Sequence, residues 1–297
     1  MSRLTALPVE TVVVDDASEA PGIEQIAAAY GAKYIHELVI GVSRARNTGL
    51  RAARGEIVAC VDDDAFPDRD WIANLVREFE DPRVAAVVGR TIPGGGPAAD
   101  DSLPARLSGL DGGPQRRVVD RETPHWFEIA NFGGLGAGAN MAFRRSFFEA
   151  WGGFDERISS GTPMPGFEEH NAFFRVLRCG FRIVYTPGAV VYHPITFDPG
   201  EARRRHLARV RSSAAYALLL FVEHREHRRA LLQYAAEGLC RKRRAWRTTG
   251  APAEPLPARK LVTAILAAPL LYIRARIRGG RTTAPRIAGV TGASGTS

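Results

Sequence analysis

The first ninety residues alternate short apolar runs with helical patterns, and this alternation constrains the fold more than any other feature of the chain. Apolar or β-branched runs predict strands at residues 10–14, 33–36, 56–61 and 84–88. Helical spacing of the apolar side chains predicts helices at residues 22–30, 43–53 and 71–79. Continuous apolar strands are typical of a mostly parallel sheet that helices cover on both faces. The predicted fold class is therefore α/β.

The pattern is interrupted once and then resumes. Residues 92–124 are rich in Gly, Pro and Asp without periodicity, and such long loops are usually functional or disordered. Further strands are predicted at residues 139–143, 181–185 and 189–192, and helices at 144–151 and 167–179. We therefore predict an α/β domain over residues 1–200, a basic helical extension over 201–278 with a Pro/Ala linker at 250–258, and a disordered tail at 279–297.

Charge divides the chain in the same way. The net charge is +8, but residues 201–297 carry 20 Lys or Arg against 5 Asp or Glu, which is +15. Residues 1–200 carry 20 against 27, which is −7. An acidic body with a basic extension needs two separate explanations.

The cysteines and the apolar runs exclude several classes of protein. Cys60, Cys179 and Cys240 are odd in number and far apart, which excludes a disulfide framework and a CxxC site. They suit a reducing compartment, and we expect a cytoplasmic protein. The longest apolar run, residues 261–273, contains a proline and is shorter than the roughly 20 residues that cross a bilayer.

Two predicted strands end in carboxylate clusters, in the sequences VVVDDAS and VDDDAFP. Ligands bind beyond the carboxyl ends of parallel strands, and clustered carboxylates are usually stabilised by a divalent cation such as Mg²⁺ or Mn²⁺. The alternative is that these aspartates only cap helices. Receiver domains, haloacid-dehalogenase-type phosphatases and P-loop proteins need a lysine at the phosphoryl group. They are excluded because no lysine occurs between Lys33 and Lys242.

A longer series of motifs carries a family resemblance. VVVDDAS, GVSRARNTGLRAARGEIVACVDDD, GLGAGANMAFRR, GGFDE, GFEEHNAFFRVLRCGFRIVY and VVYHP follow one another over about residues 9–195. The series resembles the family 2 glycosyltransferases, in order and at the spacing of that family. The resemblance implies a GT-A fold and a single inverting displacement, in which a sugar moves from a nucleoside-diphosphate sugar to an acceptor hydroxyl.

The resemblance assigns the nucleotide-sugar site residue by residue. Asp16 matches the aspartate that accepts a hydrogen bond from the base, while Arg46 and Asn47 match an ARN sequence beside the nucleotide. Simple anchoring of a helix is an equal alternative for this second pair. The glycine loop that contains Gly138 and Asn140 is implied to approach the sugar closely, since glycine has no Cβ.

The resemblance also implies a metal site. Asp62 and Asp64 fit the DxD motif, with Asp63 between them, and are expected to reach the sugar nucleotide and the metal. His193 stands where the family places a histidine that also reaches the metal. A structural role is otherwise more common for a single histidine. The implied cofactor is Mg²⁺ or Mn²⁺.

The candidate catalytic base lies in the sequence GFEEH. The family has Glu-Asp here, at the start of a helix that faces the acceptor, whereas this chain has Glu168-Glu169. Glu169 corresponds to the base and is one methylene longer than aspartate, so the choice between the two carboxylates stays open. The alternative is that glutamates at this position only stabilise the helix dipole.

The family begins with a strand and a helix before the strand that ends in VVDD, and only residues 1–8 precede it here. We therefore hypothesise an upstream start, with Met1 internal. The missing strand and the Glu-for-Asp change favour one alternative function, an inactive homologue that acts as a sugar-nucleotide-binding or membrane-associated scaffold. A second alternative is a membrane or nucleic-acid adaptor that binds through the basic extension.

Basic side chains surround the apolar stretches of residues 201–278. Such segments often lie on anionic membranes, so we expect either peripheral contact with the inner face of the plasma membrane or a solvated helical cap. A glycan or lipid-linked acceptor, in cell-envelope or polysaccharide synthesis, would fit membrane contact. Nucleic acid is not expected as a partner, because stacking aromatics do not alternate with the basic residues.

Overall fold

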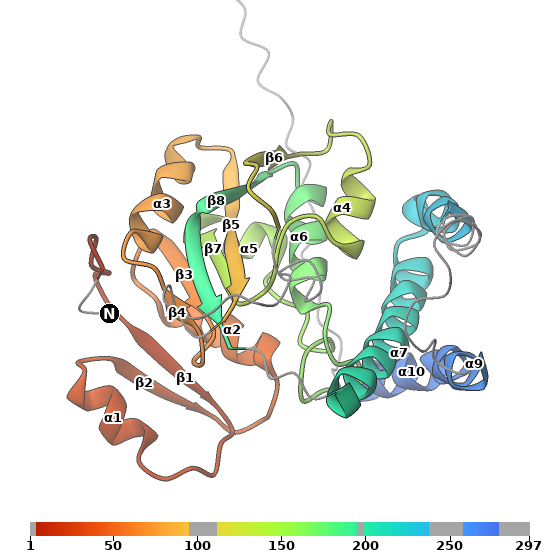
Figure 1. Cartoon of the computed structure of the whole chain (residues 1–297), viewed down its shortest axis with the longest axis horizontal. Coiled ribbons are helices and arrows are strands. Elements are labelled where there is room, and N and C mark those ends of the chain that lie inside the picture. The colour runs from red at the N-terminus through yellow and green to blue at the C-terminus, as the bar shows by residue number, and fades with distance from the viewer. Residues whose placement is uncertain (1–3, 95–111, 195–198, 238–257, 279–297) are drawn as a thin grey trace, which may run out of the picture.

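The computed structural model describes residues 4–94, 112–194, 199–237 and 258–278 (Figure 1). The strands are β1 (Val12–Asp16), β2 (Lys33–Glu37), β3 (Ile57–Val61), β4 (Phe66–Pro67), β5 (Val84–Pro93), β6 (Arg117–Val119), β7 (Asn140–Arg144) and β8 (Arg182–His193). The α-helices are α1 (Ile23–Ala29), α2 (Val42–Ala52), α3 (Trp71–Arg77), α4 (Trp126–Phe132), α5 (Phe148–Trp151), α6 (Glu168–Arg178), α7 (Pro199–Glu223), α9 (Ala258–Leu266) and α10 (Ala268–Arg278). Short 3₁₀ turns are η1 (Glu78–Glu80), η3 (Arg145–Phe147) and η4 (Arg225–His227).

The larger sheet is mixed. Its strand order is β3–β7–β5–β8–β4, with β6 also paired to β8. Among its described strands, β5 and β8 run parallel, and the other pairs are antiparallel. The α/β class with flanking helices is confirmed, but the expectation of mostly parallel pairing is wrong for this sheet. A strand that is buried on both faces shows the same apolar run whichever way its neighbours point.

A second, two-stranded sheet is formed by β1 and β2, which pair in parallel from Val12 and Lys33 to Asp16 and Glu37. The expectation that both aspartate clusters lie at the edge of one sheet is wrong. Instead, the first cluster ends a strand of this small sheet, and the second follows β3 in the larger one. The apolar pattern locates strands but does not say which of them pair. The additional strand before β1 stays a prediction.

The last strand is longer than expected. The sequence predicted one strand before residues 187–188 and another strand after them. In the structure, β8 continues through these residues to His193. A register shift between Gly89 and Arg90 of β5 accommodates the irregularity. A Cβ at Gly89 would lie 2.3 Å from the carbonyl oxygen of Ala189, so only glycine fits at this position. The unbroken strand carries His193 to the same end of the sheet as the residues that follow β3.

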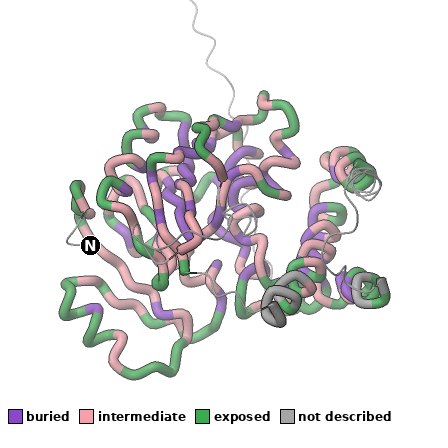
Figure 2. Tube along the Cα trace, viewed as in Figure 1, coloured by how far each residue is buried: buried purple, intermediate pink, exposed green. Residues whose placement is uncertain are grey.

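The core lies on both faces of the larger sheet (Figure 2). On one face, α3 buries Trp71 and Leu75 against β5 and β8. On the other face, side chains of α4, α6 and α7 form one cluster with β5 and β7. Helix α7 belongs to the predicted basic extension, and it shares this core through the fully buried side chains of Tyr216, Leu219 and Leu220.

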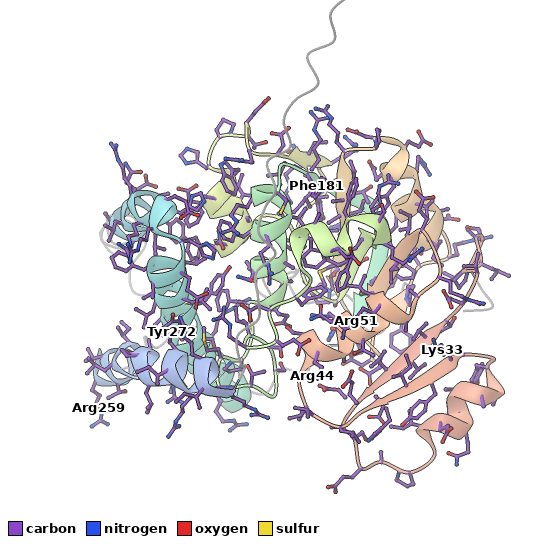
Figure 3. All side chains as sticks on the ribbon, turned by 180° about the vertical axis from the view of Figure 1, so that it is seen from behind. Lys33, Arg44, Arg51, Phe181, Arg259 and Tyr272 are labelled. Atoms are coloured by element: carbon purple, nitrogen blue, oxygen red, sulfur yellow. The ribbon has the colours of Figure 1, made fainter. Side chains whose placement is uncertain are left out.

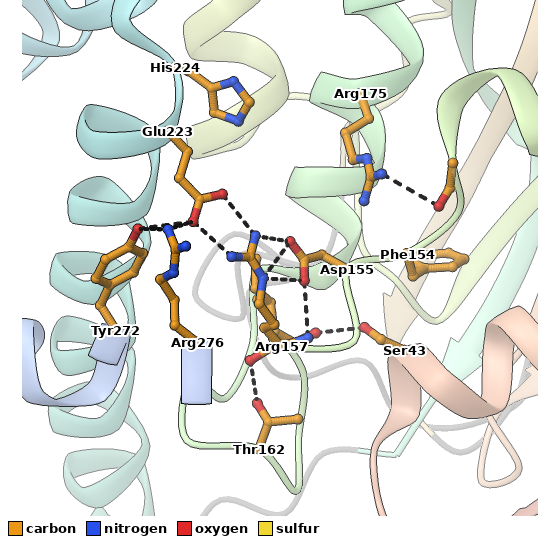
Figure 4. A network of polar contacts seen from close by, with 12 residues as sticks. Ser43, Phe154, Asp155, Arg157, Thr162, Arg175, Glu223, His224, Tyr272 and Arg276 are labelled. Atoms are coloured by element: carbon orange, nitrogen blue, oxygen red, sulfur yellow. Dashed lines mark hydrogen bonds and ion pairs between the residues drawn. The ribbon is translucent and has the colours of Figure 1, made fainter. Parts of the chain in front are cut away.

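An ion-pair network attaches the C-terminal helices to the domain (Figure 4). Arg157, in the loop between α5 and α6, binds Asp155 through two nitrogens and Glu223 of α7 through two (2.6–3.2 Å). Tyr272 of α10 donates a hydrogen bond to the same Glu223 carboxylate (3.0 Å). The network therefore connects one loop with two C-terminal helices.

Several predicted segments lie outside the residues that the structure describes. The linker at 250–257, the tail at 279–297 and most of the 92–124 loop (residues 95–111) lie outside the described residues. Among the helices that the structure describes, we find none with the length and apolar character needed to cross a membrane.

Candidate functional site

A possible metal-binding group lies where β3 and β8 end. One ligand atom from each of Asp62, Asp64 and His193 lies within 4.8 Å of the other two. The Nε2 atom of His193 is 3.3 Å from Asp64 Oδ1 and 3.7 Å from Asp62 Oδ2. In octahedral coordination with metal–ligand distances of about 2.1 Å, neighbouring ligand atoms are about 3 Å apart. These side chains therefore need only small movements to share one ion.

A hydrogen bond at Nδ1 orients the imidazole of His193 so that its Nε2 atom faces the possible metal site. Its Nδ1 atom is 2.9 Å from the carbonyl oxygen of Pro194, which can only accept. Nδ1 therefore carries a proton, and Nε2 is the ring atom that faces the two carboxylates. Two carboxylates with one imidazole fit Mn²⁺ or Mg²⁺. Asp63, between the two aspartates, is exposed and lies outside the group.

Arg46 of α2 connects this group with the glutamate pair. Its Nη2 atom contacts Asp62 Oδ1 (3.3 Å) and the carbonyl oxygen of Gly138 (3.2 Å), and its Nη1 atom contacts Glu168 Oε1 (3.3 Å). A Cβ at Gly138 would lie 3.5 Å from both Arg46 Nη2 and Glu169 Cβ. One guanidinium thus brings together residues that are more than a hundred positions apart in the sequence.

The two glutamates at the start of α6 have different electrostatic environments. Burial and the neighbouring Glu169 carboxylate raise the pKa of Glu168 to about 7, and its Oε2 atom is buried without a hydrogen-bond partner among the described residues. Burial alone would raise the pKa of Glu169 too, but the adjacent His170, 3.4 Å away, and Arg46 hold it at about 2. At neutral pH, Glu169 is therefore the fully ionised member of the pair.

The turn before the pair is strained and is supported by the C-terminal extension. Phe167 has a φ of 70°, a left-handed conformation that is unfavourable for a residue with a Cβ. Its ring stacks on Tyr216 of α7, with centroids 5.1 Å apart, and the hydroxyl of Tyr216 donates to Asn131 (2.6 Å). Phe167, His170 and Tyr216 were not among the predicted site residues, although His170 directly follows the glutamates. These contacts make α7 part of the support for the site.

Asp16 lies at the end of β1, in the small sheet. Its Oδ1 atom accepts a hydrogen bond from the backbone N–H of Gly41 (2.6 Å), directly before α2, the helix that carries Arg46. The neighbouring Asp15 is buried and accepts a hydrogen bond from Tyr34 (2.8 Å). Asp16 is thus placed at the start of the same helix, and its contact with a nucleotide base stays a prediction.

Two residues expected to bind the donor make buried hydrogen bonds within the fold. Asn140 is fully buried, donates to the carbonyl oxygens of Arg90 and Ala189, and accepts from the indole of Trp71 (2.8–3.0 Å). Asn47 is buried and bonds the backbone of Phe154 in both directions (2.8 and 2.9 Å). Their amide groups hold the sheet and a loop, and contact of either residue with the donor stays a prediction.

A family model described as "Glycosyl transferase family 2" matches residues 2–152, which is half of the chain. The protein belongs to glycosyl transferase family 2. The match agrees with the motifs and with the mixed α/β sheet that joins the aspartates to the end of β8.

The chain is also similar to several curated proteins and solved structures. The chain is 32% identical over 188 residues to a pre-mycofactocin glycosyltransferase of Mycobacterium tuberculosis, covering 61% of this chain and 37% of the relative. It is 28% identical over 198 residues to a glucosyl-dolichyl phosphate glucuronosyltransferase of Haloferax volcanii, covering 63% and 60%. The solved structure of S. aureus TarS 1-349 in complex with UDP-GlcNAc is 16% identical and covers 73% of this chain and 60% of that one, with a TM-score of 0.49. The chain spans between about a third and three fifths of these curated relatives.

The raised pKa of Glu168 predicts a pH-dependent stability. A carboxyl group whose pKa is 4.5 when unfolded and about 7 when folded stabilises the fold below pH 4.5, and this contribution is lost as the pH rises to 7. Relative to E168Q, the free energy of unfolding of the wild type should fall over this range by up to about 1.4 kcal/mol per pH unit. Urea unfolding at several pH values measures the difference. A difference that is constant with pH, as expected for E80Q on the exposed Glu80, would contradict the assignment.

Proposed function

We propose that this protein is a metal-dependent inverting glycosyltransferase that moves a sugar from a nucleoside-diphosphate sugar to an acceptor hydroxyl. The observation that carries the proposal is the contact of Arg46 with both Asp62 and Glu168. It joins a group suited to a divalent cation with a carboxylate pair suited to proton transfer. A single displacement needs both functions, one at the leaving group and one at the attacking hydroxyl.

On the donor side, Asp62, Asp64 and His193 would hold Mg²⁺ or Mn²⁺. When bound, the ion would offset the negative charge that develops on the departing diphosphate. Arg46 adds a fixed positive charge and holds the Asp62 carboxylate toward the group. Asp16 and Asp63 are proposed to contact the nucleotide sugar at the edge of this site, and the Gly138 backbone is proposed to face the sugar.

On the acceptor side, Glu169 is proposed as the base. It is ionised at neutral pH, its side chain is 18% exposed, and it lies beside Gly138 at the start of a helix whose dipole favours negative charge. Its carboxylate would take the proton of the acceptor hydroxyl as the oxygen attacks the anomeric carbon. Glu168, held by Arg46, would orient the guanidinium between the two halves of the site.

The acceptor is proposed to be a glycan or a lipid-linked sugar of the cell envelope. The support is the similarity to an enzyme whose name includes glucosyl-dolichyl phosphate, together with the basic C-terminal helices. A cytoplasmic location at the inner face of the membrane stays a prediction from the cysteines and the charge.

The donor site is tested by metal-dependent thermal stabilisation with a panel of nucleoside-diphosphate sugars. A ligand at 100 times its Kd stabilises the folded state by about 2.7 kcal/mol, which raises Tm by several degrees. We expect this shift with Mn²⁺ or Mg²⁺ present, a much smaller shift with EDTA, and loss of the metal dependence in the D62N/D64N double variant.

The control variant is E80Q, which removes one exposed carboxylate from η1 and should keep the full shift. Equal stabilisation of wild type and D62N/D64N by the same metal and nucleotide sugar would show that the ion does not bind at this group.

A further inference from the structure

Helices α9 and α10 expose their large aliphatic side chains and bury mostly small ones, which is the reverse of the usual arrangement. The side chains that they bury are small apart from one tyrosine: Ala264, Ala268, Tyr272 and Ala275. The side chains that they expose are large and aliphatic, each between 51% and 78% exposed: Val262, Ile265, Leu266, Leu270, Ile273 and Ile277. A helix that only caps a domain normally turns its large apolar residues inward.

The buried alanines have a clear role. Ala268 and Ala275 belong to the same core cluster as Tyr216, Leu219 and Leu220 of α7, and small side chains let the helices approach closely. Figure 3 shows Tyr272 between α10 and α7, whereas Arg259 lies at the outer end of α9. The aliphatic residues follow helical spacing on both helices, at positions 262, 265 and 266 and at 270, 273 and 277. They form one face, which we call the aliphatic face, on the side away from α7.

The charges beside this face have one sign. Arg259, Arg274 and Arg278 are exposed on the two helices, and Arg276 is also more than half exposed. Residues 258–278 contain no aspartate or glutamate at all. An apolar face with a rim of guanidinium groups is complementary to a lipid surface that carries anionic head groups over acyl chains. A second protein of ordinary composition would offer no such excess of negative charge.

We propose that α9 and α10 lie in the interface of an anionic phospholipid bilayer, with the aliphatic face inserted among the acyl chains. The helices have 9 and 11 residues, which gives lengths of about 14 and 17 Å, so they lie on the membrane and do not cross the roughly 30 Å core. Membrane contact was expected somewhere within residues 201–278, and this proposal assigns it to the aliphatic face of α9 and α10. The proposal does not depend on the transfer reaction.

The docked helices contact the loop that precedes the glutamate pair. Arg278 at the end of α10 contacts the carbonyl oxygen of Gly161 (3.4 Å), and Arg157 fixes the same loop to α7. That loop leads directly into Glu168 and Glu169. The acceptor side of the proposed site is therefore connected to the docked helices by a short, well-anchored segment. A lipid-linked acceptor would fit this geometry.

The test is co-sedimentation of the full chain with vesicles of phosphatidylcholine alone or of phosphatidylcholine with 30% phosphatidylglycerol. We expect binding to the anionic vesicles, and weaker binding in high salt. The L266S/I273S/I277S variant should bind at least about tenfold more weakly, because three exposed apolar side chains are lost. The R259S/R274S variant should bind anionic vesicles about fivefold more weakly for each arginine that is removed.

The matched control changes three exposed aliphatic residues far from this surface, in I26S/L38S/V76S, and should bind as the wild type does. All substituted positions are exposed, and circular dichroism checks that each variant is folded. The proposal is overturned if the wild type does not bind anionic vesicles or if L266S/I273S/I277S binds equally well. It is also overturned if the wild type forms a dimer that this variant abolishes, because the face would then belong to a second copy.

Discussion

E169Q should reduce the turnover of a nucleoside-diphosphate sugar by 10²- to 10⁴-fold, the range expected when a general base is removed. The amide has nearly the same shape as the carboxylate but cannot accept the proton of the attacking hydroxyl. The proposed metal-binding group of Asp62, Asp64 and His193 is unchanged, so the Kd of the donor in the presence of metal should change little. Steady-state kinetics and the thermal-shift titration measure the two quantities on the same protein.

Two further variants separate a base from a structural role. E169D restores the residue that the family has at this position and should keep much of the activity, because the charge remains. E168Q should affect turnover less than E169Q, since Glu168 acts through Arg46. If E169Q retains wild-type turnover, Glu169 is not the base. If neither the wild type nor E169D turns over any nucleotide sugar while binding persists, the inactive-homologue alternative is correct.

The sequence predicted that several polar side chains far apart in the chain lie close together, and their catalytic roles stay predictions. The DxD carboxylates, the terminal His193 and the glutamates of α6 were expected in one site, and the structure places them around Arg46. Polar residues at the ends of apolar runs must face outward at a sheet edge or a helix start. The alternation of strands and helices places each of them at such an end, but which of them meet depends on the strand pairing.

The sequence could not predict interactions that have no local signature. Asn47 and Asn140 lie beside site residues in the sequence, yet their side chains point into the protein and bond backbone groups about fifty or more positions away. The direction of strand pairing is also set by distant segments, so the sheet is mixed although its strands have the pattern of a parallel one. An arginine such as Arg157, in a GGFDER sequence, gives no sign that its partner is Glu223.

This last interaction is expected to be important for stability. Arg157 is 12% exposed, and its partners Asp155 and Glu223 are 5% and 21% exposed. Burial would lower the pKa of Arg157, but hydrogen bonds from the guanidinium to both carboxylates raise it above its ordinary value. Removing one member of a buried ion pair leaves uncompensated charge, which typically costs about 3–5 kcal/mol. Here two carboxylates lose the same partner.

R157A should therefore lower the free energy of unfolding by at least about 3 kcal/mol, measured by urea denaturation at pH 7. The matched control is R276A, which removes an arginine from the outer side of the same network. Its guanidinium is 56% exposed and 3.7 Å from Glu223, so the expected cost is at most about 1 kcal/mol. Equal losses for the two variants would mean that the network stabilises the fold no more than a surface pair does.

The pH dependence gives an independent check of the same network. Burial opposes ionisation of Asp155 and Glu223, but Arg157 lowers the pKa of both below their ordinary values of 3.8 and 4.5. Carboxylates with lowered pKa values stabilise the fold above these values, and the contribution is lost as the pH falls through the folded-state pKa values. The difference between wild type and R157A should thus be largest near neutral pH and shrink below about pH 4. A difference that persists unchanged at pH 3 would show that the guanidinium acts by packing alone and not by its charge.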